Sequence, residues 1–379
     1  MSNSGTTSSA TIVFSANTSW YLYNHHRNTL RTFAEAGYTV HIVSPDDDHA
    51  KKLMALGYRH TVLPIRSAST HPLRELQAFV GFLRAYRKVK PDAAFHYTIK
   101  CNLYGSLAAN LLGIPSVSSV SGLGRAFDFK GVARWVIHLA YKWTQRQTHR
   151  MVFQSTSDRD YMIDAGIVTP AKCVVVGGSG VDLALFQPRA ARPGKPFTFV
   201  FAGRVLWEKG FPWLPQAMEI LQQENPDARC LVYGFLDAVD GQYVPRNQLA
   251  EWEKQGFVEY RGPVENIADA YAEADCVILP TDYREGIPKS LLEAAAMSLP
   301  LIASNKPGCL EIVRPGETGL VCPPRDPRAL ADVMSAMIGL GDEERAAMGR
   351  KARALVEHRF DQRSIAATYL EVAASMPIR

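Results

Sequence analysis

The chain has 379 residues, of which 47% are hydrophobic and 21% charged, an ordinary composition for a soluble globular protein of about two to three domains. Its net charge of +5 is too small to argue for nucleic acid as a partner, although it suits anionic phosphates or a membrane surface. The six cysteines form no C-x-x-C pair and have no histidine cluster near them, which argues against a zinc site and a disulfide framework.

The N-terminal segment Met1–Ala10 is polar and rich in Ser and Thr, without the basic patch and apolar stretch of a signal peptide. No apolar run approaches the roughly 20 residues that a membrane-spanning helix requires. We therefore expect a protein of the reducing cytoplasm that can still lie against a membrane.

Short apolar runs alternate with longer helical patterns along the first half of the chain, which predicts successive β-α units. Helical spacing of apolar residues predicts helices over Asn24–Ala36 and Pro72–Val89. The expected strands are Thr11–Ala16, Thr39–Ser44, Thr61–Ile65, Ala93–His96, Pro115–Val120, Met151–Phe153 and Cys173–Val176.

The segment Gln187–Pro196 has the composition of a linker, and the β-α alternation restarts after it. The strands expected there are Phe197–Ala202, Arg229–Tyr233, Val258–Tyr260, Cys276–Leu279 and Leu301–Ala303. The helices expected there are Leu214–Gln223, Ser290–Met297, Pro327–Ile338 and Phe360–Met376.

Two such series predict an α/β protein with two Rossmann-like domains, whose parallel sheets face each other across a cleft. The expected bounds are residues 1–186 for the N-terminal domain and 197–359 for the C-terminal domain, joined by the linker 187–196. Residues 360–379 are expected to form a helix that packs back on the N-terminal domain. Ligands of such folds bind beyond the carboxyl ends of the strands.

The segment Thr281–Ala294 follows a predicted strand and has the residues of a phosphate site. Pro288 suits the first turn of a helix, whose free N–H groups attract phosphate, and Gly286 permits close approach of the backbone. Glu285 in the loop and Glu293 in the helix can accept hydrogen bonds from hydroxyls. These features predict a ligand with a phosphate between two polyhydroxylated groups, such as a nucleotide sugar. The alternative is an acidic loop before a helix with a solvated glutamate.

A second segment, Phe201–Gly210, also follows a strand and precedes a helix. Gly203 opens the turn, and Arg204 and Lys209 can both reach one diphosphate, with the guanidinium as a bidentate fork and the ammonium as a compact charge. An ordinary pair of basic surface residues is the alternative interpretation.

Together the two segments resemble the retaining family 4 glycosyltransferases, which have the GT-B architecture of two Rossmann-like domains. The signature of that family is a glutamate, seven residues and a second glutamate, and Glu285 and Glu293 match it. Further matches are Pro280, Gly178–Asp182 and Gly316–Val321, so the resemblance covers nearly the whole chain and is strong in the second half.

The resemblance implies that residues 1–186 form an acceptor-binding domain and residues 197–359 a nucleotide-sugar-binding domain. It also implies roles for the matching residues. Arg204 and Lys209 would hold the donor diphosphate and stabilise the leaving group, and Glu285 would contact donor-sugar hydroxyls near the reacting carbon. Glu293 would bind the ribose hydroxyls. The other donor-binding residues would be Gly203, Gly286, Ile287 and Pro288 along the phosphate and sugar, and Arg261 and Gly262 at the nucleobase. The family implies retention of the anomeric configuration and neither metal nor other cofactor, because Arg and Lys neutralise the developing phosphate charge.

The first half departs from the family at two places. The loop Asn17–Asn24 after the first strand has no glycine, and Ser121 occupies the position at which many relatives carry a histidine. A histidine base is therefore not expected, and the donor phosphate itself can take the acceptor proton.

The segments Ser19–Leu22, Tyr97–Lys100 and Ser121–Gly124 resemble a subgroup that extends sugars on undecaprenyl diphosphate for bacterial surface glycans and glycoproteins. This resemblance implies transfer of a hexose or N-acetylhexosamine from a UDP-sugar to a lipid-linked or other glycan acceptor. Arg27 and Arg125 are the first candidates for an acceptor diphosphate, and Trp20, Asn24 and Lys100 are further acceptor-binding candidates.

The segment Phe129–Arg150 intersperses basic residues with tryptophans and aliphatic residues, a composition that suits an anionic membrane interface. We therefore expect a cytoplasmic protein that is peripheral on the inner face of the cytoplasmic membrane, with no nucleic acid partner. The alternative is a core-packed helix with a solvated basic side. His25, His26 and His96 could line the cleft, but a lone histidine is more often structural and they are left out of the site.

Three other functions fit parts of the pattern. A nucleotide-sugar 2-epimerase would share the architecture but need no acceptor, and the Glu–seven–Glu string disfavours it. An oxidoreductase is weakened because no G-x-G-x-x-G follows the first strand. A non-catalytic sugar-nucleotide or lipid-binding module would not need Glu285, Glu293, Arg204 and Lys209 together.

Overall fold

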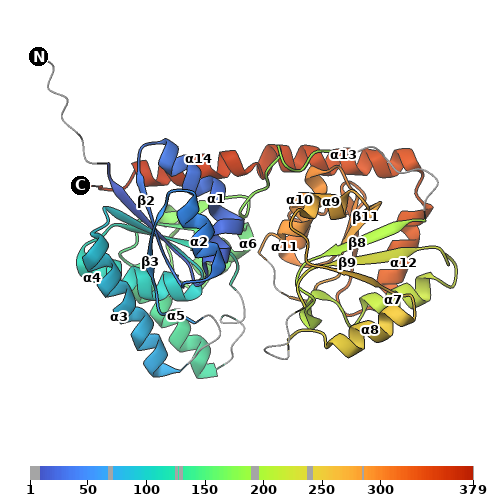
Figure 1. Cartoon of the computed structure of the whole chain (residues 1–379), viewed down its shortest axis with the longest axis horizontal. Coiled ribbons are helices and arrows are strands. Elements are labelled where there is room, and N and C mark those ends of the chain that lie inside the picture. Colours follow the sequence, from blue (N-terminus) through green and yellow to red (C-terminus); the bar gives the residue numbers. More distant parts are fainter. Residues whose placement is uncertain are drawn as a thin grey trace, which may run out of the picture. The chain divides into compact units, whose positions relative to one another are not determined.

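The computed structural model describes residues 9–66, 71–123, 127, 131–188, 196–236, 242–283 and 286–378. It contains two compact units, each built around one parallel β-sheet (Figure 1). Unit 1 comprises Met1–Ser179 and Gln362–Arg379, and unit 2 comprises Gly180–Asp361. The predicted α/β class is therefore confirmed.

Unit 1 has a seven-stranded sheet in the order β3-β2-β1-β4-β5-β6-β7, with all neighbouring strands parallel. Its strands are β1 Thr11–Ser15, β2 Thr39–Ser44, β3 Arg59–Val62, β4 Ala93–Tyr97, β5 Ser116–Val120, β6 Arg150–Phe153 and β7 Cys173–Val175. Its helical segments are α1 Ser19–Glu35, α2 Asp48–Ala55, α3 Pro72–Val89, the π-helix η1 Cys101–Gly105, α4 Ser106–Leu112, α5 Gly131–Gln145, α6 Thr156–Asp164, the 3-10 helix η3 Pro170–Lys172 and α14 Gln362–Ala374.

Both faces of this sheet are buried. Ile12 and Phe14 of β1 pack with α1 and α14, whereas Val13 packs with α3 and α4 on the opposite face. Successive side chains of a strand point to opposite faces, so a strand covered on both sides is apolar throughout. This explains why the strands of the first half read as continuous apolar runs.

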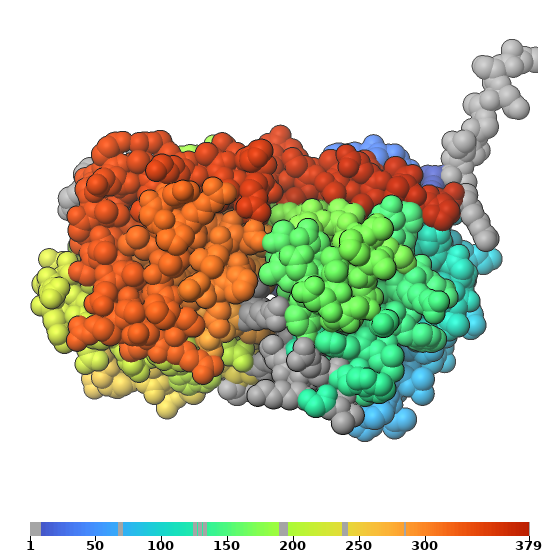
Figure 2. Space-filling model, turned by 180° about the vertical axis from the view of Figure 1, so that it is seen from behind, coloured from blue at the N-terminus to red at the C-terminus, as the bar shows by residue number. Residues whose placement is uncertain are grey.

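The C-terminal segment belongs to unit 1. Tyr369 of α14 is fully buried, and its hydroxyl lies 2.7 Å from the Ser119 hydroxyl of β5. Ser375 contacts His149, with 2.9 Å between the Ser375 Oγ and the His149 Nε2. Figure 2 shows this segment in red against the green surface of unit 1.

Unit 2 has a six-stranded parallel sheet in the order β10-β9-β8-β11-β12-β13. Its strands are β8 Thr198–Ala202, β9 Arg229–Tyr233, β10 Glu259–Gly262, β11 Cys276–Leu279, β12 Leu301–Ser304 and β13 Gly319–Cys322. Its helical segments are the 3-10 helix η4 Trp207–Lys209, α7 Leu214–Leu221, α8 Arg246–Lys254, α9 Ile267–Tyr271, α10 Lys289–Ala296, α11 Pro307–Leu310, α12 Pro327–Gly339 and α13 Asp342–Arg359.

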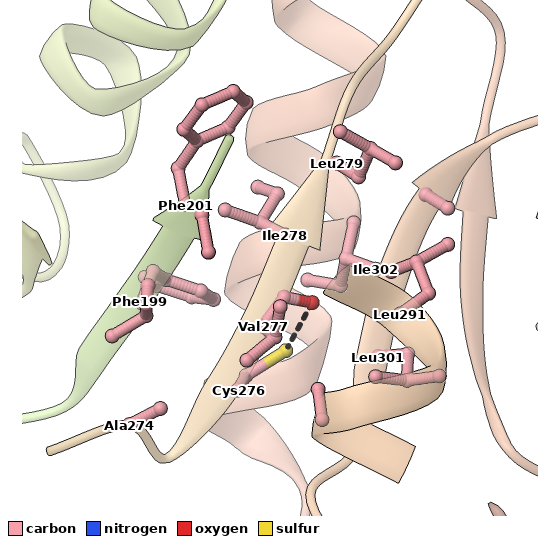
Figure 3. Close-up of a cluster of buried hydrophobic side chains, with 14 of the residues drawn as sticks. Phe199, Phe201, Ala274, Cys276, Val277, Ile278, Leu279, Leu291, Leu301 and Ile302 are labelled. Atoms are coloured by element: carbon pink, nitrogen blue, oxygen red, sulfur yellow. Dashed lines mark hydrogen bonds between the residues drawn. The ribbon is translucent and has the colours of Figure 1, made fainter. Parts of the chain in front are cut away.

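The core of unit 2 lies around its central strands (Figure 3). Phe199 and Phe201 of β8, Ile278 of β11, Leu291 of α10 and Ile302 of β12 are all excluded from solvent. This apolar contact fixes α10 against the sheet and so positions the loop that precedes it.

Three of the boundaries that differ from the expected ones have a clear local reason. Helix α1 begins at Ser19 rather than Asn24, because the Thr18 side chain caps it by accepting a hydrogen bond from the Tyr21 amide. Strand β3 covers Arg59–Val62 and ends before Pro64, which has no N–H for a strand ladder. Helix α10 starts at Lys289, one residue before the expected Ser290, and Pro288 is its N-cap with an extended ψ of 119° rather than a residue of the first turn.

The division between the units falls after Ser179 and after Asp361. Val181 donates a backbone hydrogen bond of 2.9 Å to Phe360 O and pairs with Asp361, which ties residues 180–188 to unit 2 ahead of the expected linker. Most of that expected linker, residues 189–195, lies outside the described residues.

Each sheet reverses its winding direction between two central strands, β1 and β4 in unit 1 and β8 and β11 in unit 2. Crevices for ligands form at the carboxyl ends of such adjacent strands. The predicted site segments follow these strands: residues 203–210 follow β8 and residues 280–293 follow β11.

Candidate active site

The loops after β8 and β11 are joined through one backbone atom. The carbonyl oxygen of Glu208 accepts hydrogen bonds from the Asp282 amide at 2.8 Å, the Tyr283 amide at 3.1 Å and the Thr281 hydroxyl at 3.2 Å. The two segments singled out separately in the sequence therefore form one structure at the switch point of unit 2.

Close backbone packing makes glycine necessary between these loops. Gly210 has a φ of +98°, and a Cβ on it would lie 2.3 Å from the carbonyl oxygen of Pro280. Gly234 at the end of β9 packs similarly on Gly203, since its Cβ would lie 1.7 Å from the Gly203 oxygen. A larger residue at Gly210 or Gly234 would force the loops apart.

The two predicted cations belong to the joined loops. Arg204 lies exposed in the turn after β8, and Lys209 is half-buried at the end of η4. Arg284 and Glu285 lie outside the described residues. Gly286 and Ile287 are half-buried, and Ile287 packs against the core of unit 2.

The start of α10 has an uncapped backbone. Pro288 at the N-cap offers no side-chain acceptor, so the first amides of the helix receive no side-chain cap. Such a helix start favours an anion through its N–H groups and its dipole. This feature holds although Pro288 is the N-cap and not a residue of the first turn.

Glu293 is not the solvated glutamate of the alternative interpretation, because only 8% of its surface is exposed. Its Oε2 accepts a hydrogen bond of 3.0 Å from the Tyr271 hydroxyl, and its Oε1 lies 3.8 Å from the Lys289 ammonium. Burial raises the pKa of the Glu293 carboxyl, while the Lys289 charge and the Tyr271 hydrogen bond act in the opposite direction. A desolvated carboxylate of this kind binds a hydroxyl donor strongly.

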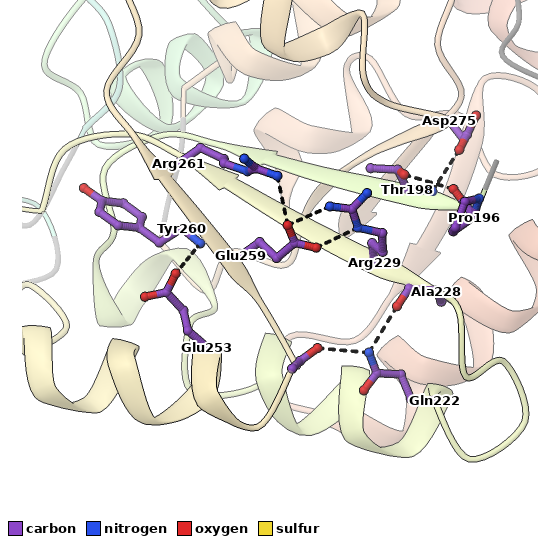
Figure 4. Close-up of polar contacts among 11 residues, drawn as sticks. Pro196, Thr198, Gln222, Ala228, Arg229, Glu253, Glu259, Tyr260, Arg261 and Asp275 are labelled. Carbon is purple, nitrogen blue, oxygen red and sulfur yellow. Dashed lines mark hydrogen bonds and ion pairs between the residues drawn. The ribbon is translucent and has the colours of Figure 1, made fainter.

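Arg261 and Gly262 lie at the carboxyl end of β10 (Figure 4). The Arg261 guanidinium contacts the Glu259 carboxylate at 2.9 Å, and the same carboxylate binds Arg229 through two bonds of 2.6 and 2.7 Å. The Gly262 carbonyl accepts a hydrogen bond of 3.0 Å from the Gly234 amide. The predicted nucleobase segment is thereby tied to the strand end beside Gly203.

Asp282 is a site-loop residue that sequence reasoning missed. Its carboxylate binds Lys306, which follows β12, at 2.8 Å, and Arg325, which follows β13, at 2.7 Å. Burial raises the pKa of Asp282, but the hydrogen bonds from Lys306 and Arg325 outweigh it and lower that pKa overall. The position of Lys306 shortly after the predicted strand Leu301–Ala303 was a signal for half of this clamp, whereas Arg325 follows β13, which the sequence did not predict.

The acceptor candidates that the structure describes each have partners of their own. Trp20, Asn24 and Arg27 lie along one side of α1, where the Asn24 side chain donates to the Trp20 carbonyl and Arg27 stacks on Tyr23. Lys100 is bound instead to Glu75 and the Arg66 carbonyl, at 2.7 and 2.8 Å. Arg125 lies outside the described residues.

Among the three histidines considered for the cleft, His96 has a structural role. His96 is fully buried between the Tyr86 hydroxyl at 2.7 Å and the Ser106 hydroxyl at 3.1 Å. Burial lowers its pKa to about 3, so it stays neutral and does not line a cleft. His25 lies 3.3 Å from the Ser179 hydroxyl, and His26 is buried.

Helix α5 presents apolar side chains to solvent. Trp135 and Trp143 are 64% and 62% exposed, and Val136 and Leu139 are also exposed. Lys142 and Arg146 are exposed within the same segment, whereas Tyr141 faces the core of unit 1. The helix packs on the core and exposes basic residues, as the alternative interpretation has it, but it also exposes two tryptophans.

Neither a membrane-spanning helix nor a cluster of metal ligands is present among the described residues. Within these ranges, no helix has both the length and the apolar character to cross a membrane. The described part of the chain also has no group of three or more His, Cys, Asp or Glu side chains that could hold a metal ion.

Comparison with known proteins places both units in one kind of enzyme. A family model described as Glycosyl transferase 4-like matches residues 11–155, and one described as Glycosyl transferases group 1 matches residues 196–339. The chain is similar to N,N'-diacetylbacillosaminyl-diphospho-undecaprenol alpha-1,3-N-acetylgalactosaminyltransferase of Campylobacter jejuni, with 25% identity over 93% of this chain and 95% of the relative. It is also similar to UDP-Gal:alpha-D-GlcNAc-diphosphoundecaprenol alpha-1,3-galactosyltransferase of Escherichia coli, with 26% identity over 62% of each chain.

Solved structures match the fold over nearly the whole chain. A glycosyltransferase from Rickettsia africae superposes with a TM-score of 0.79 and 18% identity, covering 97% of this chain and 100% of the other. Anabaena HepE in complex with UDP and glucose superposes with a TM-score of 0.77 and 19% identity, covering 96% and 99%. Since a glycosyltransferase model matches each unit and both sheets have the corresponding architecture, the chain belongs to the GT-B glycosyltransferases that combine a 4-like with a group 1 domain.

Proposed function

We propose that this protein transfers a hexose or an N-acetylhexosamine from a UDP-sugar to a glycan acceptor on undecaprenyl diphosphate. The reaction would serve the assembly of a bacterial surface polysaccharide or a glycoprotein glycan. The observation that carries the proposal is the junction at Glu208, which unites the loop of Arg204 and Lys209 with the loop that leads to α10.

The donor half of the reaction follows from the chemistry of these loops. Arg204 and Lys209 supply positive charge for a diphosphate, and the uncapped start of α10 adds its N–H groups. Glu293 supplies a desolvated carboxylate for the ribose hydroxyls. The two side-chain cations support transfer without a metal, because they neutralise the charge that develops on the leaving diphosphate.

In the proposed step, the bond between the anomeric carbon and the diphosphate oxygen breaks, and a bond to the acceptor oxygen forms on the same face of the sugar. The acceptor proton passes to the departing phosphate, so UDP leaves and the anomeric configuration is retained. Ser121 at the expected histidine position supports a phosphate rather than a histidine as the base.

The acceptor half rests on the relatives and on unit 1. Two similar enzymes are named for acceptors on undecaprenyl diphosphate. The exposed tryptophans and cations of α5 suit an anionic membrane surface, where such an acceptor is found. We therefore place the protein on the inner face of the cytoplasmic membrane as a peripheral enzyme.

The test is an assay of the purified full chain with a panel of UDP-sugars and lipid-linked acceptors from membrane extract. We expect acceptor-dependent release of UDP, a product heavier by one sugar in mass spectrometry, and activity that survives EDTA. Lys209→Ala and Glu285→Gln should each lower kcat/KM by about 10²- to 10³-fold. Lys254→Ala, an exposed charge on α8, is the matched control.

Two outcomes would contradict the proposal. An NMR spectrum that shows an epimerised nucleotide sugar in the absence of acceptor would indicate the 2-epimerase. Full activity in both Lys209→Ala and Glu285→Gln would show that the site lies elsewhere.

A further inference from the structure

A pocket of about 320 Å³ opens in unit 1, and all of its lining residues belong to that unit. The chain that follows β3 forms one wall through Ile65 and Arg66, and the first turns of α3 form another through Arg74 and Glu75. Lys100 enters from the chain that follows β4. The pocket therefore lies at the carboxyl edge of the sheet, where ligands of α/β folds bind.

The charges in the pocket are unbalanced, with three cations, Arg66, Arg74 and Lys100, against the single carboxylate of Glu75. Lys100 and Glu75 form an ion pair of 2.7 Å in which each side chain is only 18% exposed. The guanidinium-bearing residues Arg66 and Arg74 are exposed at the pocket mouth. Two guanidinium forks and one ammonium are the groups that bind phosphate oxygens best.

Glu75 is held firmly beside Lys100. Tyr104 lies in the same region, and its pKa is raised by burial and then by its hydrogen bond to the Glu75 carboxylate. The Glu75 carboxylate therefore already serves as the anion that is paired with the Lys100 ammonium. An incoming phosphate would compete with this carboxylate for the Lys100 ammonium, so Glu75 should weaken binding of an anion.

The backbone around Lys100 is unusual on both sides. Thr98 has a φ of 72°, a left-handed conformation that is costly for a β-branched residue. The π-helix η1 begins at Cys101, directly after Lys100, and such segments are frequent at functional sites. The backbone is therefore irregular on both sides of Lys100, with one left-handed residue before it and a π-helix after it.

We propose that this pocket binds a phosphate-bearing anion, and that this anion is the diphosphate of the lipid-linked acceptor. The second part rests on the proposed function. In this proposal Arg66 and Arg74, together with Lys100, bind the acceptor diphosphate. Arg27, which stacks on Tyr23, no longer has that role.

The first experiment measures binding of inorganic pyrophosphate to the full chain by calorimetry. All variants are made in a protein that already carries Arg204→Ala and Lys209→Ala, because these two substitutions remove the candidate diphosphate site of unit 2. On that background, Arg74→Ala should weaken binding at least tenfold and Glu75→Gln should strengthen it. Arg84→Ala removes an equal charge from α3 outside the pocket and should change nothing.

The proposed pocket would be wrong if Arg74→Ala and Arg84→Ala changed the affinity for pyrophosphate equally, or if Glu75→Gln lowered that affinity. Because this measurement involves no turnover, it stands whether or not the protein transfers sugar. A failed sugar-transfer assay together with the expected calorimetry would therefore count against the proposed function and not against the pocket.

The second experiment identifies the source of the phosphate. If it is the acceptor diphosphate, Arg74→Ala raises KM for the lipid-linked acceptor at least tenfold and leaves kcat and KM for the UDP-sugar within about twofold. If Arg74→Ala leaves the acceptor KM unchanged and reduces binding to phosphatidylglycerol vesicles, the pocket holds a phospholipid headgroup, and the acceptor assignment is wrong.

Discussion

The carbonyl oxygen of Glu208 lies 2.8 Å from the amide nitrogen of Asp282, and this hydrogen bond couples the two loops at the switch point of unit 2. One residue on from Lys209, Gly210 packs against Pro280 with no room for a side chain. The position of the Lys209 ammonium therefore depends on backbone contacts that belong to a different strand. Substitutions that separate the loops should weaken donor binding without removing any charged group.

Gly210→Ala tests this dependence. Its added Cβ would lie 2.3 Å from Pro280 O, and its φ of +98° is unfavourable for alanine. We expect a loss of stability of at least about 2 kcal/mol and weaker UDP binding, because strain and displacement of the loop combine. Thermal unfolding and calorimetry with UDP measure the two effects.

Gly256→Ala is the control for this substitution. Gly256 has a φ of +80°, but an added Cβ has no atom within 4 Å, so alanine carries only the conformational cost of about 1 kcal/mol. UDP affinity should then be unchanged. If the two variants lose the same stability and bind UDP equally, close packing of the loops does not position the donor site.

Glu293→Gln should raise the stability of the protein at pH 8 while it weakens UDP binding. Burial raises the pKa of the Glu293 carboxyl in the folded protein, so the folded state disfavours the ionised form and loses stability as the pH rises through that pKa. Glutamine removes this penalty and can still accept the Tyr271 hydrogen bond. We expect the variant to be more stable than the wild type at pH 8, with a difference that shrinks as the pH falls toward 4.

The same variant should bind UDP about tenfold or more weakly, since a charge-assisted hydrogen bond to the ribose is lost. Urea unfolding across the pH range and calorimetry with UDP provide the two readouts. A variant that is less stable than the wild type at every pH would show that the charge of Glu293 supports the fold.

Sequence reasoning succeeded where an apolar run is bounded by turn residues. The strands Thr39–Ser44 and Cys276–Leu279 and the helix Pro72–Val89 have the expected bounds, because burial on both faces or on one helical side leaves a clear pattern. Strand β13 was missed because it is short and only two of its four residues, Gly319 and Cys322, are buried. Helix α13 was missed because charged residues surround much of its length and blur its apolar side.

The sequence predicted the segments that make up the site, but not the contacts between residues of different segments. The motifs around Arg204 and Glu293 could be recognised because each follows a strand directly. The ion pair of Lys100 with Glu75 could not, since it joins residues 25 positions apart in different elements. The same holds for the Asp282 clamp, whose partner Arg325 lies 43 positions along the chain.

Trp135→Ala with Trp143→Ala should impair membrane binding. Both indoles are exposed on α5 beside Lys142 and Arg146, so they can enter the interface of an anionic bilayer while the cations meet its headgroups. We expect at least a tenfold loss of binding to phosphatidylglycerol vesicles in a flotation assay. Phe235→Ala, which removes an exposed aromatic side chain from unit 2, should bind like the wild type. Equal binding of all three proteins would exclude α5 as the contact.

His96 should make the fold sensitive to acid. Its pKa is lowered to about 3 by burial, while in the unfolded chain it returns to about 6.5, so the unfolded state binds the proton first as the pH falls. Stability from this residue is complete above pH 6.5 and is lost below it by up to about 1.4 kcal/mol per pH unit. His96→Gln removes the titrating group and keeps a polar partner for Tyr86 or Ser106. The variant should be less stable at pH 7 but lose less stability between pH 6 and pH 5 than the wild type, measured by urea unfolding. Parallel losses in the two proteins would mean that another group controls the acid sensitivity.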